Sequence, residues 1–541
     1  MDTPLTNLNG TEHYNGYSEY EPSEDQPSED EPLLPASPEA KPSIPFPPTP
    51  PHSPRPIIAL LTGVTFILNF GGFIMTMPFT RICEDIICQH YYASLSEPSP
   101  PAPISEALCK GDPVQSELAI IIGGKFFTTC LPSLALSIPY GLLADRIGRK
   151  PVFLLSMAGS LLSELSGLAI IWWWRVFPLR LVWVTPIWQI IGGSYPVGSA
   201  MIYAAVADVA PEESRAQTFL ALIGGGLAAQ ILGPMLSSYL MMWSSWPPIL
   251  LGIAMIALGT VLFLFVPETL HLRSPKSPTM PILGSPLTPP LSLRPASLFV
   301  LIKKHLRTIL ASSSTSTSLP ILLLLSTFSF VILATQIVQL SLRDISARFN
   351  WSLAQSGLLL SLRALIDMVV VILLLPLASH ILTQPRHGMG LALSTRAKDY
   401  LLALASTSIM VLGSTLLGLS PPLPLVLVAL AVFALGSGLG GLCRALVTEL
   451  VPREQVGSLY AAIGVVEVLG SVVGGPGLAW LYGVGLELKG WWRGGPFVMV
   501  AVVGVSCGGA LVVARRVEGR TSMDRDRGED DWNAGVLLEM H

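Results

Sequence analysis

Six ionisable side chains lie inside long apolar stretches of the chain, where a charge can serve ion pairing, proton transfer or solute binding. They are Lys125, Glu164, Arg363, Asp367, Arg444 and Glu467. A charge at membrane depth is costly unless it is paired or hydrated, so each is a candidate coupling or substrate residue. Arg363 and Asp367 are four residues apart, which places them on one helix face and permits a direct salt bridge. The pair could instead have a structural role only, in which each residue neutralises the charge of the other within the membrane.

The two candidate acids Glu164 and Glu467 are flanked by small residues, which favour close helix contacts. Burial favours the neutral form of a carboxyl group, so an acid at this depth can take up and release a proton near neutral pH. Either acid could therefore be the coupling site. Either could instead pair with Lys125 or Arg444 for packing, and Arg444 could also extend its head to the interface.

The ten residues from Gly141 to Lys150 form a short charged loop between two apolar stretches. Its basic residues are Arg146, Arg149 and Lys150, and they assign the loop to the cytosol by the positive-inside tendency. Gly141 and Gly148 allow a tight turn and close helix approach. Orientation does not require Asp145. A charge-paired contact that depends on conformation explains this acid better than a topology anchor does.

The elements that must position these residues are membrane helices. The 541 residues are 51% hydrophobic and only 13% charged, which excludes a water-soluble globular class. Apolar runs near the roughly 20 residues needed to cross a bilayer predict about twelve helices of an all-α integral membrane protein. These runs cover residues 57–79, 118–140, 151–173, 181–207, 216–240, 247–267, 319–341, 353–378, 399–420, 423–448, 456–483 and 495–514.

Basic residues set the predicted orientation, with both termini in the cytosol. Basic residues on the inside outnumber those on the outside by about two to one. The outside loops are expected to hold Arg81, Lys110, Arg175, Arg180, Arg343, Arg348, Lys489 and Arg493. Most tryptophans fall at the ends that this topology places outside, as expected for indoles at the interface. The first membrane helix must direct insertion, because the polar, acidic N-terminal region does not have the pattern of a signal peptide.

Two polar stretches divide the chain into its predicted parts. The parts are a disordered acidic, Pro-rich cytosolic tail (1–55), a six-helix bundle (56–268), a cytosolic central loop (269–316), a second six-helix bundle (317–516) and a cytosolic tail (517–541). Within the first tail, Glu29–Leu34 matches an acidic dileucine signal, so a sorting adaptor is a possible partner. Matches this short also arise by chance.

The two bundles carry related sequences. An acid-x-x-Pro-x-Glu pattern begins at Asp208 after the fourth run and at Glu449 after the tenth. Gly233-Pro234 in the fifth run corresponds to Gly475-Pro476 in the eleventh, at nearly the same offset, and these residues are candidates for helix packing. The matches suggest a duplication, and repeated halves around a central site are typical of alternating-access carriers.

The charged loop resembles that of the major facilitator superfamily, Gly-x-Leu-x-Asp-Arg-x-Gly-Arg-Arg/Lys. The matching residues are Gly141, Leu143, Asp145, Arg146, Gly148, Arg149 and Lys150. The resemblance extends over about residues 56–516 and includes Pro267-Glu268-Thr269 at the end of helix six. It implies that Asp145 packs against the start of helix eleven and that Arg149 pairs with Asp208. These contacts would form a cytosolic latch that holds the outward-facing state.

Other features depart from the family pattern. Trp188 stands where proton antiporters of the drug-efflux branch carry an arginine, and Ser237-Ser238 follow Gly233-Pro234 where those antiporters have glycines. Residues 78–84 are locally similar to fungal carriers related distantly to proton-coupled folate and haem carriers. The loop at 380–398 lacks the glycine and aspartate frame, so the second half is expected to have lost its counterpart of the latch.

The outer loops offer two covalent modifications. Cys83, Cys88 and Cys109 lie in or beside the first outer loop, where one disulfide could form between an undetermined pair. Asn350 begins a sequon that lies on the outer side, close to the membrane.

The function predicted is that of a monomeric secondary transporter, coupled to protons, that moves a small organic solute across the plasma or vacuolar membrane. Efflux of a metabolite or drug is favoured. A proton-coupled importer of an organic anion and a transporter-like nutrient receptor are the alternatives. The chain has no Gly-x-x-x-x-Gly-Lys-Ser/Thr loop and no His-Glu-x-x-His motif, which argues against an enzyme. We expect no cofactor, no metal and no nucleic-acid partner.

Overall fold

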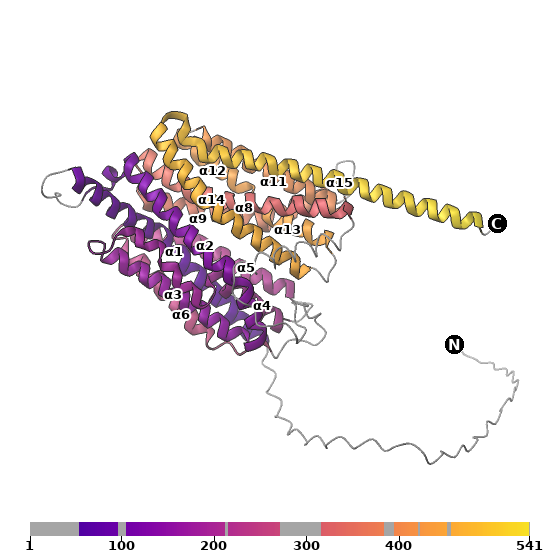
Figure 1. Cartoon of the computed structure of the whole chain (residues 1–541), viewed down its shortest axis with the longest axis horizontal. Helices are drawn as coiled ribbons and strands as arrows, with labels where there is room; N and C mark the ends of the chain where they lie inside the picture. The colour runs from indigo at the N-terminus through magenta and orange to yellow at the C-terminus, as the bar shows by residue number, and fades with distance from the viewer. Residues whose placement is uncertain are drawn as a thin grey trace, which may run out of the picture. The chain divides into compact units, whose positions relative to one another are not determined.

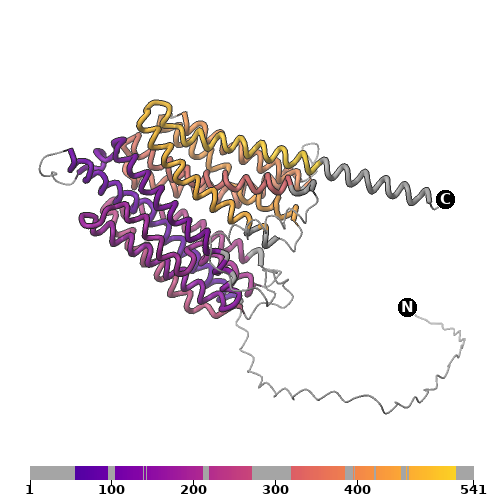
Figure 2. Tube along the Cα trace, in the orientation of Figure 1, coloured from indigo at the N-terminus to yellow at the C-terminus, as the bar shows by residue number. Residues whose placement is uncertain are grey.

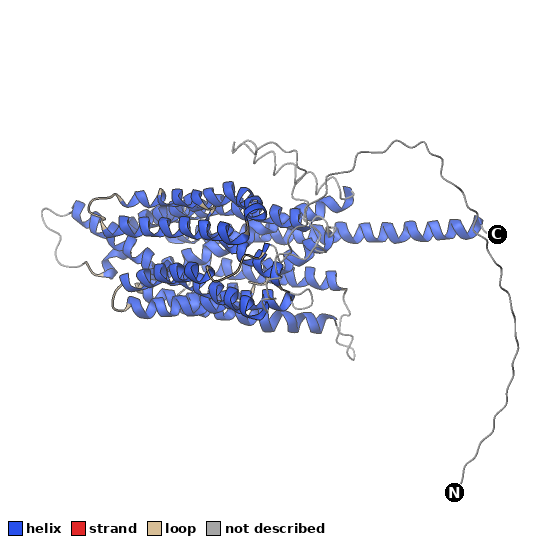
Figure 3. Cartoon of the chain, turned by 90° about the horizontal axis from the view of Figure 1, so that it is seen from below, coloured by secondary structure: helices blue, strands red, loops and turns tan. Residues whose placement is uncertain are grey.

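The computed structural model describes residues 54–95, 104–210, 215–270, 315–383, 394–419, 422–451 and 456–539. The elements in these ranges are helical, with no strand among them (Figure 3). Twelve spans are long and apolar enough to cross a membrane, which confirms the predicted all-α membrane fold. The sorting signal at Glu29–Leu34 lies outside the described residues, as do nearly all of the first tail and most of the central loop.

The first half holds six of the spans, up to Phe263. Its elements are α1 (Pro54–Leu95), η1 (Glu106–Lys110), α2 (Asp112–Ile147), α3 (Arg149–Trp172), η2 (Leu179–Trp183), η3 (Thr185–Ile191), α4 (Ser194–Val209), α5 (Arg215–Met241) and α6 (Trp246–Phe263). The indigo-to-magenta helices in Figure 1 belong to this half. Its two hydrophobic clusters are built around residues such as Phe153 and Ile121.

The second half holds the other six spans, from Leu319 onward. Its elements are α8 (Thr315–Phe349), α9 (Leu353–Val369), η5 (Val370–Leu374), α10 (Leu375–Thr383), α11 (Thr395–Gly418), α12 (Leu423–Leu435), α13 (Leu439–Leu450), α14 (Val456–Leu488), η7 (Gly490–Gly494) and α15 (Gly495–Glu539). Figure 2 traces this half in orange and yellow beside the first. One large cluster, with Phe328 and Phe433 fully buried, forms its core.

Four of the described spans combine more than one helical element, and the twelfth joins the 3-10 helix η7 to α15. The fourth span begins as the 3-10 helices η2 and η3 and turns at Gly193, whose φ of 79° is the left-handed conformation that glycine adopts readily. The eighth contains the π-helical segment η5 between α9 and α10, and the tenth breaks at Gly436–Gly438 between α12 and α13. Broken backbone at membrane depth is tolerated where neighbouring helices satisfy the freed polar groups.

Two helices run further than the apolar pattern predicts, which corrects three loop assignments. Helix α1 continues to Leu95, so Arg81 lies in a helix and pairs with Glu84 at 3.1 Å. Helix α8 continues to Phe349, so Arg343 and Arg348 also lie in a helix rather than an outer loop. Hydropathy underestimates both helices because charges that find partners or a cavity do not end a helix.

The halves meet through α2 against α14 and α5 against α9. A Cβ added to Gly475 of α14 would lie 2.5 Å from the Phe126 ring of α2, so this glycine sits at a close approach between the halves. Gly233 makes a similar approach within the first half, where its added Cβ would lie 2.9 Å from Phe73 Cβ. Pro234 and Pro476 lie inside α5 and α14.

Helices α1 and α6 cross at a close backbone approach within the first half. An added Cβ on Gly252 would lie 2.7 Å from the Gly71 carbonyl oxygen, whereas one on the exposed neighbour Gly72 would meet nothing within 4 Å. We therefore expect Gly252→Ala to cost about 1–3 kcal/mol by overpacking. Gly72→Ala should be neutral or slightly stabilising, because alanine is the better helix former.

Thermal unfolding of the purified protein in detergent measures this difference. The midpoint of Gly252→Ala should fall clearly below those of wild type and Gly72→Ala. Equal midpoints for the two variants would show that the α1–α6 crossing does not need a glycine.

Candidate functional site

A cavity of about 340 Å³ lies between the halves, within the usual range for small-molecule sites. Helices α1 and α2 form one wall, and α8 and α14 form the other. The lining residues are Thr76, Met77, Thr80, Ile122, Gly123, Phe126, Thr335, Gln336, Gln339, Leu340, Arg343, Gly475, Leu478 and Ala479. Of these described residues, Arg343 alone is ionisable. The apolar pattern gave no sign of this site, because Arg343 follows the end of the predicted seventh run.

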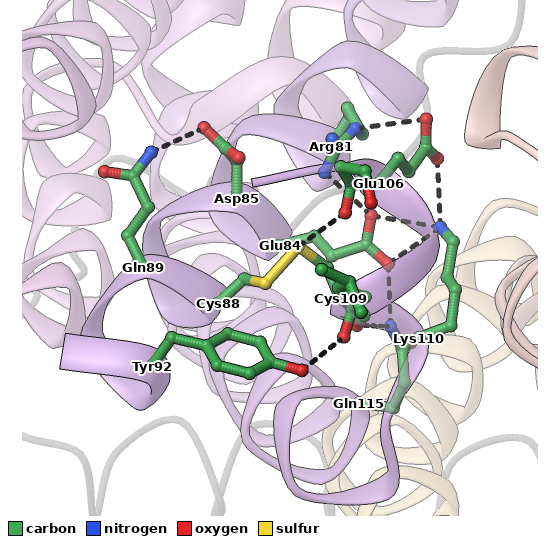
Figure 4. The surroundings of a disulfide bond; sticks show 12 residues. Arg81, Glu84, Asp85, Cys88, Gln89, Tyr92, Glu106, Cys109, Lys110 and Gln115 are labelled. Atoms are coloured by element: carbon green, nitrogen blue, oxygen red, sulfur yellow. Dashed lines mark hydrogen bonds and ion pairs between the residues drawn. A yellow bond between two sulfur atoms is a disulfide. The ribbon is translucent and has the colours of Figure 1, made fainter. Parts of the chain in front are cut away.

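The 3-10 helix η1 packs against α1, α2 and α8 at the end of the bundle that also holds the link between α8 and α9. We call this the outer end, after its predicted orientation. A disulfide joins Cys88 near the end of α1 to Cys109 of η1, and Cys83 is free and buried. The sequence alone did not determine which two of the three cysteines form the disulfide. Figure 4 shows the disulfide beside a cluster of charged side chains from the same elements.

That outer charge cluster comprises Arg81, Glu84, Glu106, Lys110 and Gln115. The Lys110 ammonium lies 2.9 Å from Glu84 and 3.0 Å from Glu106, and the Arg81 side chain contacts both carboxylates. Gln115 donates to Glu84 at 2.7 Å. These contacts hold the loop tightly against α1 and α2.

Glu106 also reaches the second half. Its Oε1 accepts a 2.9 Å hydrogen bond from the backbone N–H of Leu353, at the N-terminus of α9. Burial would raise the pKa of the Glu106 carboxyl, but the charges of Lys110 and Arg81 and the Leu353 hydrogen bond bring its pKa below the ordinary value. Glu106 is therefore ionised at neutral pH, and an anion at a helix N-terminus is stabilising.

The residues predicted as a charged loop are mostly helical: 141–147 end α2, Arg149 and Lys150 begin α3, and only Gly148 lies between the two helices. This end of the bundle, called the cytosolic end after its predicted orientation, holds ion pairs within the first half. Arg149 Nη2 lies 2.8 Å from Asp145 Oδ1, and Arg149 Nε lies 3.5 Å from Asp208 Oδ2. Leu143 is packed against the core and Arg146 is exposed. An added Cβ on Gly141 would meet nothing within 4 Å. The expected contact of Asp145 with the start of helix eleven falls partly outside the description, because the side chains of 456–458 are not described.

Glu268, which follows α6, contacts residues of the predicted latch and was not assigned by the sequence pattern. Its carboxylate accepts hydrogen bonds from the backbone N–H groups of Arg149 at 2.9 Å and Lys150 at 3.1 Å. Burial would raise the pKa of Glu268, but these and two further backbone hydrogen bonds lower it below the ordinary value. Gly148 has φ 109°, and an added Cβ there would collide with this carboxylate. The family resemblance at Pro267-Glu268-Thr269 was the sequence signal that pointed to Glu268.

The second half has an ion pair at the equivalent place, although its loop lacks the glycine and aspartate frame. Arg396, at the start of α11, lies 3.1 Å from Glu449 near the end of α13 and 3.0 Å from Glu518 of α15. Arg149 and Asp208 hold the same places in α3 and α4. The glycine frame shapes a turn and is not needed to form the pair, so its absence from the loop did not predict the loss of the pair.

The six intramembrane charges form three pairs. Lys125 Nζ lies 3.7 Å from Glu164 between α2 and α3, and 3.9 Å from the Phe79 ring centroid. Arg363 lies 3.3 Å from Asp367 on α9, and the π-helical segment η5 follows this pair. These two pairs leave their arginine and lysine 15% and 20% exposed.

The third pair is the most open and faces the other half. Arg444 of α13 contacts Glu467 of α14, and the Arg444 side chain is 44% exposed. Its guanidinium carbon lies 5.6 Å from the Phe328 ring centroid. Arg444 also interacts electrostatically with Tyr203 of α4, in the first half. The Arg444–Glu467 pair therefore borders the space between the halves.

Asn350 is exposed in the short link between α8 and α9. It has φ 57°, and the Ser352 hydroxyl of its sequon accepts a hydrogen bond from Gln355 N as the N-cap of α9. Glycosylation of Asn350 stays a prediction.

Comparison with known proteins agrees with this geometry. Residues 112–395 match the profile of the Major Facilitator Superfamily. The MFS efflux pump atnC of Emericella nidulans is 32% identical over 468 residues, which cover 85% of this chain and 88% of that protein. The efflux pump ustT of Aspergillus flavus is 29% identical over 463 residues, with coverage of 85% and 88%.

Among solved structures, a POT family transporter in complex with 5-aminolevulinic acid has a similar fold. Its TM-score is 0.56 at 16% identity, covering 85% of this chain and 96% of that one. The fold, the complete loop motif and the fungal relatives lead to one assignment. The chain belongs to the Major Facilitator Superfamily.

Proposed function

We propose that this protein exports a small organic solute by alternating access, driven by protons, in the plasma or vacuolar membrane. The observation that carries the proposal is the cavity between two six-helix halves that meet near their outer ends. An added Cβ on Gly357 of α9 would lie 2.7 Å from Ser238 Oγ of α5, and Glu106 bridges to Leu353. Contacts at the outer ends support an inward-facing arrangement.

An inward-facing arrangement allows a solute to enter from the cytosol. Rocking of the halves would break the outer contacts and close the cytosolic end. The names of two relatives, which describe efflux pumps, support export over import.

The latch at the cytosolic end would hold the alternative state. We propose that Asp145, now paired with Arg149, moves against the start of α14 when that end closes. Asp208 and Glu268 would keep Arg149 and the start of α3 in place during this exchange.

Glu467 is our candidate for the coupling acid. Its pairing with Arg444, at the most open of the three pairs, suits a carboxylate that is alternately protonated and ion-paired. Protonation would release Arg444, so proton binding and the position of a charged side chain would be linked.

The proposed function first predicts that cells containing the protein export a solute. Comparing metabolites inside and outside cells that contain or lack the protein should reveal at least one organic solute that accumulates outside only when the protein is present. A protonophore should abolish that accumulation, because the driving gradient collapses. Identical metabolite distributions in the two cell lines would contradict the proposed export.

The latch gives a second prediction. Asp145→Asn should lower the initial rate of solute export roughly tenfold, as expected for the loss of one charge-assisted contact that stabilises one state. Glu117→Gln is the matched control, because it removes an acid that pairs with Arg180 at 2.9 Å on the outer side of the same half. Surface abundance should be unchanged in both variants. Normal flux through Asp145→Asn in reconstituted vesicles would remove Asp145 from the latch.

The coupling acid gives a third prediction, which compares two intramembrane glutamates. Glu467→Gln should make export insensitive to an imposed proton gradient while exchange of solute across the membrane continues, because the solute path stays intact. Glu164→Gln should keep its response to the gradient. Vesicle flux with and without a pH difference measures both. A gradient response that survives in Glu467→Gln and disappears in Glu164→Gln would assign coupling to the other pair.

A further inference from the structure

Arg343 of α8 is a cation on the wall of the cavity between the halves. Gln336 and Gln339 lie seven and four residues before it, so all three occupy one face of the helix, and all three line the cavity. This position differs from the six intramembrane charges described above, each of which has an oppositely charged partner.

The hydrogen-bonding capacity of Arg343 is largely unused. Its Nε donates to the Gln339 carbonyl at 3.4 Å, which is a long contact. Its Nη1 has no exposed surface and no hydrogen-bond partner among the described residues. A guanidinium carries five N–H donors in a planar fork, and leaving a buried donor of a half-buried cation without a partner is costly.

Nearby carboxylates do not neutralise Arg343. The next residue, Asp344, accepts hydrogen bonds from Arg493 at 2.8 Å and from the Tyr482 hydroxyl at 3.2 Å. Across the described part of the chain, no carboxylate lies within 4.0 Å of the Arg343 guanidinium. The cavity wall therefore carries one uncompensated positive charge.

The rest of the lining suits the body of an organic molecule. Phe126 and Leu478 supply apolar surface on opposite walls, and Thr76 and Thr80 of α1 supply hydroxyl groups. A ligand that combines an acidic group with an apolar body would find a partner for each part. The planar fork of an arginine matches a carboxylate in a bidentate way.

We propose that Arg343 binds the acidic group of the transported solute, so that the cavity selects organic anions, carboxylates above all. The assignment of this ligand as cargo rests on the proposed transport function. The site itself can be tested on purified protein without any flux.

The first test measures the charge preference of the cavity by cysteine labelling. Gln339→Cys places a thiol one helical turn from Arg343, in a background where the half-buried Cys130 is replaced by serine. The anionic reagent 2-sulfonatoethyl methanethiosulfonate should react at least about tenfold faster than the cationic 2-(trimethylammonium)ethyl reagent, after both rates are divided by those with a free thiol in solution.

Three further variants separate Arg343 from other causes of this preference. Adding Arg343→Gln to the Gln339→Cys protein should abolish the preference for the anionic reagent. Adding Arg343→Lys should preserve it, because the positive charge remains. Arg348→Gln removes another cation of α8, one outside the described lining of the cavity, and should leave it nearly unchanged. A preference that persists in Arg343→Gln, or is absent from the parent protein, would overturn the proposal.

The second test asks whether the site recognises a carboxylate. 2-Naphthoate and 2-naphthamide have the same shape and differ in charge, and each is tested for protection of the thiol introduced by Gln339→Cys against neutral methyl methanethiosulfonate. Naphthoate should protect at a concentration several-fold lower than the amide, and Arg343→Gln should make the two equal. Equal protection in the parent protein, or protection by neither compound, would overturn the proposal.

The two proposals fail separately. Absence of export in cells would refute the proposed function and leave the labelling results in force. A cavity that does not distinguish charge, in a protein that exports a solute, would overturn the anion site alone.

Discussion

A polar group inside a bilayer cannot hydrogen-bond to water, so it needs a partner within the protein, and the arrangement of this protein depends on that constraint. Each of the six intramembrane charges met in the sequence has an opposite charge within reach, between α2 and α3, along α9, or between α13 and α14. The pairs differ in how much they are exposed, and the most open one borders the space between the halves. Arg343 is the exception, since the described residues give it a cavity where the others have a carboxylate.

Contacts inside a half and contacts between halves are built differently. Within the first half, Gly71 and Gly252 bring two backbones together, and the tight crossing favours permanent packing. Between the halves, Gly475 lies close to Phe126 beside the cavity, and at the outer end the backbone N–H of Leu353 donates a hydrogen bond to Glu106. The interface also buries apolar side chains, since Met77 and Ala119 of the first half belong to the hydrophobic cluster of the second.

Much of the architecture was predictable, because a helix needs roughly 20 apolar residues to cross the lipid bilayer. The twelve apolar runs agree with the spans, and the pattern from Gly141 to Lys150 identified the family from the chain alone. Helix ends were less predictable, since α1 and α8 continue through charged residues whose surroundings, such as Lys110 beside Glu84 and the cavity beside Arg343, are distant in sequence. Hydropathy alone therefore placed Arg343 beyond the end of the helix. The choice of Cys88 over Cys83 also depended on how the outer loop folds back on α1.

The two cytosolic ion pairs, Arg149 with Asp208 and Arg396 with Glu449, tie corresponding helices of each half together. Each half thus has its own brace near the same end, independent of the glycine turn that accompanies only the first. If each braced bundle moves as a rigid body about one hinge axis, as the proposed alternating access would require, rotation about that axis is a single coordinate of motion. Opening at one end would then close the other, and no separate signal would be needed to coordinate the two gates.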